Sequence, residues 1–213
     1  SVALPNDLAG VLIENSATND VFGNLISGNS ANGVMIADPP SSIASEGNLV
    51  RGNTIGLDKY GTRSIPNAGA GVGVQNASFN QIGGPAAGDG NVISGNSGDG
   101  VLVQRSPGFE ARENRIEANI IGPNTAVDAP IGNGGAGVAM LYGQFTTVHN
   151  NVIGGNSAGI TMSAPCTEGN VLTANFIGTD SSETHHFGNG EHGVFINSRA
   201  HENIVGASLG TDC

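Results

Sequence analysis

Residues 90–103 read GNVISGNSGDGVLV and contain the short unit that recurs along the chain. Residues 100–103 of this stretch form one of seven copies of a Gly-Val-x-Ile motif, or a close variant of it, here called the GVxI motif. The other copies begin at Gly10, Gly33, Gly71, Gly137, Gly159 and Gly193. A short unit repeated in this way indicates a solenoid of stacked coils.

Each GVxI motif is followed by two more apolar segments of the form Asn-x-Val and Asn-x-Ile. Three strands of three or four residues, repeating every 22 residues or more, are too short to bury a core as hairpins. Stacked as coils, with parallel strands about 4.8 Å apart, they can line a common interior. The inward column of the GVxI strands is predicted to be Val11, Val34, Val72, Val101, Val138, Ile160 and Val194.

Paired asparagines lie five residues apart in most repeats, at the turns between the segments. Thr146 replaces the first Asn of the fifth repeat, and Ser208 replaces the second Asn of the seventh. Stacked Asn side chains can bond both turn backbone and the Asn of the next coil, so this pattern has a structural explanation. The predicted structural Asn frame is Asn24, Asn53, Asn91, Asn119, Asn151 and Asn175.

Composition supports one β-rich domain over residues 1–213. The chain has 35 Gly, 25 Asn and no Trp, so it is poor in helix formers and rich in turn formers. A formal net charge of -11 with only 7 Lys and Arg argues against nucleic-acid binding and against anionic membrane surfaces. No apolar run reaches the length of about 18 residues needed for membrane insertion. Cys166 and Cys213 are too few for a disulfide framework and are interpreted as free thiols, with a disulfide between them as the alternative.

These units, such as GNVISGNSGDGVLV and Asn-x-Ile-Gly, resemble the right-handed parallel β-helix, or pectin-lyase-like, repeats of large bacterial secreted and surface proteins. The resemblance covers essentially the whole chain. It implies an all-β, right-handed parallel β-helix of about seven three-stranded coils, with an extracellular or cell-surface location. Polysaccharide lyases, hydrolases, epimerases, tailspikes and adhesins share this architecture, so the fold leaves the activity open.

Alternate coils carry a twenty-residue loop frame, at residues 53–72, 119–138 and 175–194. Each copy has Asp or Asn at its sixth place, Asn at its fifteenth and an apolar residue at its thirteenth. We interpret the frame as a packing device in which the Asx residue braces the loop and the apolar anchor pins it to the body. The anchors are Ile65, Ile131 and Phe187. The same coils have long turns after the GVxI strand, so both extensions are predicted to form walls beside that sheet.

The third loop contains the candidate metal ligands Asp180, Glu183, His185, His186 and His192. Their spacing fixes no coordination geometry, so a solvated loop without a metal or cofactor is predicted, with Ca²⁺ as the alternative. Residues 191–193 are faintly similar to the Gly-His-Gly segment of the polygalacturonase family, but a paired acid and base is not found, and His192 is read as a turn residue. The charges around Arg105, Arg112 and Arg115 alternate in sign with those of neighbouring Glu residues and are expected to screen one another. No catalytic residue is assigned.

The sequence therefore favours a non-catalytic structural or adhesive module of a secreted or surface protein. Its expected partners are further copies of itself or flanking domains, with a polysaccharide as another candidate. Neither end offers a capping helix, so the chain is expected to continue into further protein or to associate. The alternative is a carbohydrate-active enzyme, either a polysaccharide lyase or a glycoside hydrolase, with a groove along the GVxI sheet. Two carboxylates in an open groove would favour the enzyme, whereas a groove filled by the loop anchors would favour the module.

Overall fold

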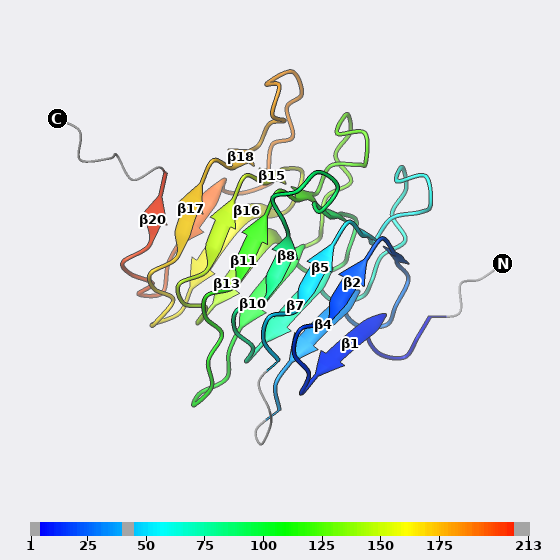
Figure 1. Ribbon diagram of the computed structural model, residues 1–213. Helices are drawn as coiled ribbons and strands as arrows, with labels where there is room; N and C mark the ends of the chain where they lie inside the picture. Colours follow the sequence, from blue (N-terminus) through cyan, green and yellow to red (C-terminus); the bar gives the residue numbers. More distant parts are fainter. Residues whose placement is uncertain (1–4, 40–44, 207–213) are drawn as a thin grey trace.

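The protein is a parallel β-helix, as the computed structural model shows for residues 5–39 and 45–206. Three sheets of parallel strands run along the stack, and Figure 1 shows the coils following one another from the blue end to the red end. All regular elements of the described residues are strands, so the all-β prediction is confirmed. In this part of the chain no helix is long and apolar enough to cross a membrane.

The strand order confirms the predicted repeat, since every GVxI motif supplies a strand of one sheet. The first sheet contains β1 (Val11–Glu14), β4 (Val34–Ala37), β7 (Val72–Gln75), β10 (Val101–Gln104), β13 (Ala136–Leu141), β16 (Ala158–Ser163) and β19 (Val194–Ile196). The second sheet contains β2 (Asp20–Phe22), β5 (Leu49–Arg51), β8 (Gln81–Gly83), β11 (Arg115–Glu117), β14 (Thr147–His149), β17 (Val171–Thr173) and β20 (Ile204–Val205). The third contains β3 (Leu25–Ile26), β6 (Thr54–Ile55), β9 (Val92–Ile93), β12 (Ile120–Ile121), β15 (Val152–Ile153) and β18 (Phe176–Ile177).

Strand lengths differ from the expected three or four residues. The strands of the third sheet have two residues each, whereas β13 and β16 have six. In β13 and β16 the strand starts before the motif, because Ala136 and Ala158 pair with each other. The predicted seventh strand of the third sheet, around Ser208, lies outside the described residues.

The core is one continuous apolar column. The predicted inward residues of the first sheet pair in register, and Val34, Val72, Val101, Val138 and Ile160 are fully buried. Inward Ile and Val residues of the other two sheets complete the same cluster. The predicted register is therefore confirmed from the first coil to the seventh.

Close packing explains the glycine that opens the first six GVxI motifs, whereas Gly193 of the seventh meets only Ile177, at 3.4 Å. A Cβ atom on Gly100 would lie 2.5 Å from Cγ2 of Ile121 and 2.5 Å from the carbonyl oxygen of Gly137. Gly71 meets Ile93 in the same way, at 2.4 Å. The corner between the third and first sheets thus leaves no space for a side chain, because core isoleucines and the next coil fill it.

Asparagine ladders run along the three corners. In the second corner, Asn119 Nδ2 donates to Asn151 Oδ1 at 3.0 Å, and Asn119 Oδ1 accepts from the backbone and side-chain N–H groups of Asn91. Asn119 is 1 % exposed, so its amide is satisfied by protein groups alone. This ladder contains the whole predicted Asn frame; the first corner repeats it with Asn19, Asn48, Asn80, Asn114, Asn170 and Asn203, and the third with Asn6, Asn29, Asn67, Asn96, Asn133, Asn156 and Asn189.

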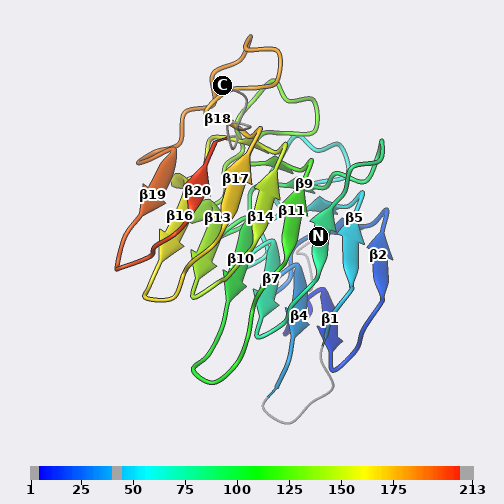
Figure 2. The ribbon, with the colours of Figure 1, turned by 60° about the vertical axis from the view of Figure 1, so that its left-hand side comes forward.

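The loop frames form short hairpins outside the coil body. Isolated antiparallel bridges join Leu57 to Ser64, Pro123 to Pro130 and Thr179 to His186. Figures 1 and 2 show the three hairpins on one side of the body and the long turn after β10 on the opposite side. The exterior of the first sheet lies between these two sets of loops, because the hairpins precede its strands and the long turns follow them.

Candidate functional site

The hairpins are braced at the sixth place of the frame, by one Asx side chain in each. Asp58 Oδ1 accepts hydrogen bonds from the backbone N–H groups four and five residues later, at 2.9 and 3.2 Å. Asn124 does the same at 3.0 and 3.3 Å, and Asp180 at 2.8 and 3.1 Å. The amide of Asn124 accepts the same two backbone hydrogen bonds in its hairpin as the carboxylates of Asp58 and Asp180 accept in theirs. The shared Asx residue is therefore a turn brace.

Asp180 has further partners within its own loop. Its Oδ2 accepts from the Ser182 hydroxyl at 2.6 Å and from the Thr184 hydroxyl at 3.1 Å, and it lies 3.1 Å from Nδ1 of His185. The Ser182 hydrogen bond, followed by those from His185 and Thr184, lowers the pKa of Asp180 well below its usual range. Its oxygens are therefore already occupied as acceptors.

The other candidate ligands of this loop lie apart. Glu183 and His186 are exposed, and the His192 ring stacks on Phe195 with 4.8 Å between ring centroids. Within residues 5–39 and 45–206, no three His, Cys, Asp or Glu side chains are grouped so that they could hold a metal ion. Cys166 is exposed and free, while Cys213 lies outside the described residues.

The three loop anchors are buried to very different degrees. Phe187 is 2 % exposed, Ile131 is half-buried and Ile65 is 38 % exposed. Phe187 packs on Gly154 and Ile65 near Gly28, both in turns that follow the third sheet.

The first hairpin leans over the third sheet. Its tip residues Lys59 and Tyr60 line a shallow cavity together with Leu25 and Thr54, which lie on the exterior of that sheet. The tip of this hairpin therefore lies over the third sheet. The reason is that its anchor packs against the turn after β3, so the hairpin follows that turn.

Most arginines of the described residues are engaged locally. Arg115 pairs with Glu117 at 3.0 Å, and Arg112 Nε lies 2.9 Å from Glu110 Oε2, without hydrogen-bond alignment. The predicted mutual screening is confirmed for Arg112 and Arg115. Arg105 instead donates to backbone carbonyl oxygens. Arg51 bridges Asp20 and Asp89 at 2.8 Å each on the second sheet.

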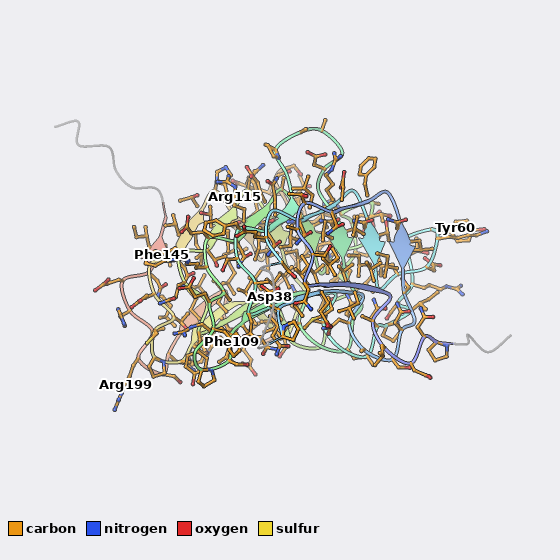
Figure 3. All side chains as sticks on the ribbon, turned by 60° about the horizontal axis from the view of Figure 1, so that its bottom comes forward. Asp38, Tyr60, Phe109, Arg115, Phe145 and Arg199 are labelled. Atoms are coloured by element: carbon orange, nitrogen blue, oxygen red, sulfur yellow. The ribbon has the colours of Figure 1, made fainter. Side chains whose placement is uncertain are left out.

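A cleft of about 360 Å³ opens at the C-terminal ends of β1, β4 and β7. We call it the first-sheet cleft. Figure 3 shows Asp38 and Phe109 together on this side of the molecule, whereas Arg115 lies on the side of the second sheet. The residues that line the cleft are Glu14, Ala37, Asp38, Pro39, Gln75, Asn76, Ser106 and Phe109.

Hydrogen bonds fix the turn that carries Phe109. Asn76 Oδ1 accepts from the Ser106 backbone N–H at 2.6 Å, and its Nδ2 donates to the Asp38 carbonyl at 3.2 Å. Arg105 donates to the carbonyl oxygens of Phe109 and Tyr142, at 3.1 and 2.9 Å. Asn76 has a φ of 57°, a left-handed conformation that Asn tolerates better than most residues. The cleft is thus built by side chains from three successive coils and the turn after β10.

The chemistry of the cleft is mixed. Glu14 and Asp38 contribute carboxylates, Gln75 contributes an amide and Phe109 an aromatic ring. This set can hydrogen-bond hydroxyl or amino groups and can pack against an apolar or cationic face. Sequence reasoning missed these residues. The sequence signal that could have found them is the polar residue, Glu14 or Gln75, that ends its first-sheet strand and alternates outward from the core.

Asp99 lies at the start of β10, at the other end of the strand. Its Oδ1 accepts the Ala136 backbone N–H at 2.8 Å, and burial raises the pKa of its carboxyl group. Two coils earlier, Asn32 Oδ1 accepts the Ala70 backbone N–H, also at 2.8 Å. Asp99 therefore occupies a structural position that an amide fills equally well.

Comparisons with known proteins identify the fold and no family. No described protein family matches the sequence, and no curated protein matches it. A crystal structure of a mutant of the periplasmic alginate epimerase AlgG matches with a TM-score of 0.63 and 16 % identity, over 93 % of this chain and 48 % of that one. A structure of DFA-IIIase from Arthrobacter chlorophenolicus A6 in complex with GF2 matches with a TM-score of 0.35 and 13 % identity, over 94 % and 53 %. The chain thus spans about half the length of these proteins. The likeness to the epimerase structure agrees with the parallel β-helix fold described above.

Proposed function

We propose that the chain is a non-catalytic β-helix module of a secreted or cell-surface protein, and that it binds a polysaccharide at the first-sheet cleft. The observation that carries the proposal is the composition of the cleft, where two carboxylates, an amide and an aromatic ring meet. Sugars present hydroxyl groups around an apolar ring face, and such a set of side chains complements both. Self-association and flanking domains remain part of the proposal.

The similar fold of a periplasmic alginate epimerase supports a glycan as the ligand class, because alginate is a polysaccharide. The non-catalytic role is supported by the lining of the cleft, which holds no Lys, Arg or His side chain that could exchange a proton beside the two carboxylates.

Isothermal titration with a panel of oligosaccharides tests the binding. Phe109→Ala is expected to weaken the affinity about tenfold or more, because it removes the aromatic face of the cleft. Phe22→Ala is the matched control, since Phe22 is an exposed Phe of the second sheet whose ring faces Arg51. Failure of the folded protein to bind any member of the panel would refute the proposal, as would equal effects of the two substitutions.

A carbohydrate-active enzyme is the second candidate. It is favoured by one observation, the presence of Glu14 and Asp38 in a single open cleft. Chromatography of oligosaccharides after long incubation would reveal product formation. If the chain is an enzyme, Glu14→Gln and Asp38→Asn should each abolish turnover but preserve binding. If it is a non-catalytic module, the parent protein should form no product.

A further inference from the structure

We infer that the first-sheet cleft selects a basic amino-sugar glycan, with free ammonium groups, over neutral or uronate glycans. The inference rests on the proposed glycan binding and names the ligand class of the same site. It follows from the two carboxylates that line the cleft and from the nearby Arg105, whose guanidinium is bound to backbone carbonyl oxygens.

The cleft carries uncompensated negative charge. Glu14 and Asp38 both line it, and neither belongs to an ion pair within the described part of the chain. Asp38 Oδ1 accepts one backbone hydrogen bond, from Ser45 at 2.7 Å, so acceptor capacity is left over. The whole chain, with a net charge of -11, adds a field of the same sign.

The cation of the adjacent turn does not neutralise this charge by contact. Arg105 Nη1 donates to the Phe109 carbonyl and its Nε to the Tyr142 carbonyl, so the guanidinium holds the turn in place. The Cζ atom of Arg105 lies 5.8 Å from the centre of the Tyr142 ring, so the guanidinium also lies over that ring. The guanidinium therefore acts as a brace for the wall of the cleft.

A ligand with ammonium groups suits these features best. An ammonium group can form charge-assisted hydrogen bonds with the two carboxylates, and Phe109 offers a ring face that accepts a cation or the apolar face of a sugar. A uronate would place its own carboxylate beside Glu14 and Asp38, where like charges repel, and this discriminates against it. At about 360 Å³ the cleft is within the range of small-ligand sites, so it engages a short stretch of the glycan.

The experiment compares three oligosaccharides of equal length by titration calorimetry at slightly acidic pH. They are a glucosamine oligomer, its fully N-acetylated counterpart and an oligogalacturonate. The glucosamine oligomer and its acetylated counterpart differ in the ammonium group, so they form the matched pair. We expect the glucosamine oligomer to bind about tenfold or more tightly than its acetylated counterpart, with an affinity that falls as salt is added.

The double variant Glu14→Gln, Asp38→Asn should reduce the preference between the matched pair to about one. Binding of the acetylated oligomer should stay within about threefold of the parent, because Phe109 and Gln75 are unchanged. Glu191→Gln is the control, since Glu191 is an exposed carboxylate of the third loop, outside the cleft. Thermal melts of all variants verify that they are folded.

The outcomes separate this inference from the proposed function. Equal affinities for the matched pair, a preference for the uronate, or uronate binding that requires Ca²⁺ would overturn the amino-sugar inference but leave glycan binding standing. Absence of binding to all three oligomers and to the wider panel would refute the proposed function as well. Loss of the preference in the Glu191→Gln control would also overturn the inference, because it would show that net charge, rather than the cleft, decides selectivity.

Discussion

Asp99 and Asn32 occupy equivalent positions just before strands of the first sheet, one with a carboxyl group and the other with an amide that also donates to Met35 Sδ. Each accepts a backbone N–H of the next coil at 2.8 Å. Burial raises the pKa of Asp99, so the folded state holds its proton more tightly than the unfolded state does. Ionisation of this carboxylate therefore destabilises the fold, and the penalty disappears as the pH falls through the raised folded pKa and below the unfolded value.

We expect Asp99→Asn to raise the melting temperature at neutral pH and to have little effect near pH 3, where the carboxyl group is protonated in both states. Asn32→Asp is the reciprocal change and should lower the melting temperature at neutral pH. Calorimetric melts across this pH range measure both effects. A lower melting temperature for Asp99→Asn at neutral pH would show that the charge itself contributes to the fold.

Thr146 interrupts the asparagine ladder of the first corner. Its backbone N–H still donates to Asn170 Oδ1 at 2.9 Å, but its side chain has no amide to continue the ladder from Asn114. We expect Thr146→Asn to restore the missing bonds and to stabilise the protein by about 1 kcal/mol. That corresponds to a rise in melting temperature of about 2–4 °C. Asn80→Thr, which interrupts the same corner, should have the opposite effect; two changes of the same sign would contradict the ladder argument.

At the scale of elements, the three hairpins form a natural comparison, since two are braced by Asp and one by Asn. The Thr62 backbone N–H is the main cause that lowers the pKa of Asp58, and the Ser182 hydroxyl is the main cause for Asp180. A lowered pKa in the folded state stabilises the hairpin above the unfolded pKa. That stabilisation is lost as the pH falls below about 4 towards the folded value.

We therefore expect the hairpins at residues 57–64 and 179–186 to lose amide protection at acid pH before the hairpin at residues 123–130 does. Hydrogen exchange, corrected for intrinsic rates, measures this for the N–H groups four and five residues after each brace. Asp180→Asn gives the third hairpin an amide brace like that of the second, and it should reduce the loss of protection at acid pH. Equal loss of protection in all three hairpins would mean that the braces do not control their opening.

Much of the element scale could be predicted from the sequence because the repeat sets it. Each GVxI motif must place its Val and Ile inward, and the parallel register then follows for every coil. The direction of the hairpins could not be predicted in this way, because it depends on how Ile65 meets the turn at Gly28 in a neighbouring coil. The first-sheet cleft was missed for a similar reason: it unites Glu14, Asp38 and Phe109 from turns of unequal length.

For the whole molecule, stability comes from contacts between successive coils. Inward residues of the fourth coil, such as Val101 and Val103, are fully buried. In the last described coil, Ile196 is 43 % and Val205 54 % exposed, although they continue inward columns that are buried in the coil before. The core column thus presents apolar surface at this coil, and β19 and β20 are the edge strands of their sheets among the described residues.

We expect the 213-residue polypeptide to associate reversibly through this coil, because stacking another coil there would bury Val205 as Leu172 is buried at 2 %. Val205→Lys should weaken the association about tenfold or more, measured by sedimentation velocity over a concentration series. Ile204→Lys is the matched control: Ile204 is 46 % exposed but pairs with Val171 in an outward row, so its substitution should matter less. A monomer at all concentrations, or equal effects of the two lysines, would show that the stack does not associate through its core column.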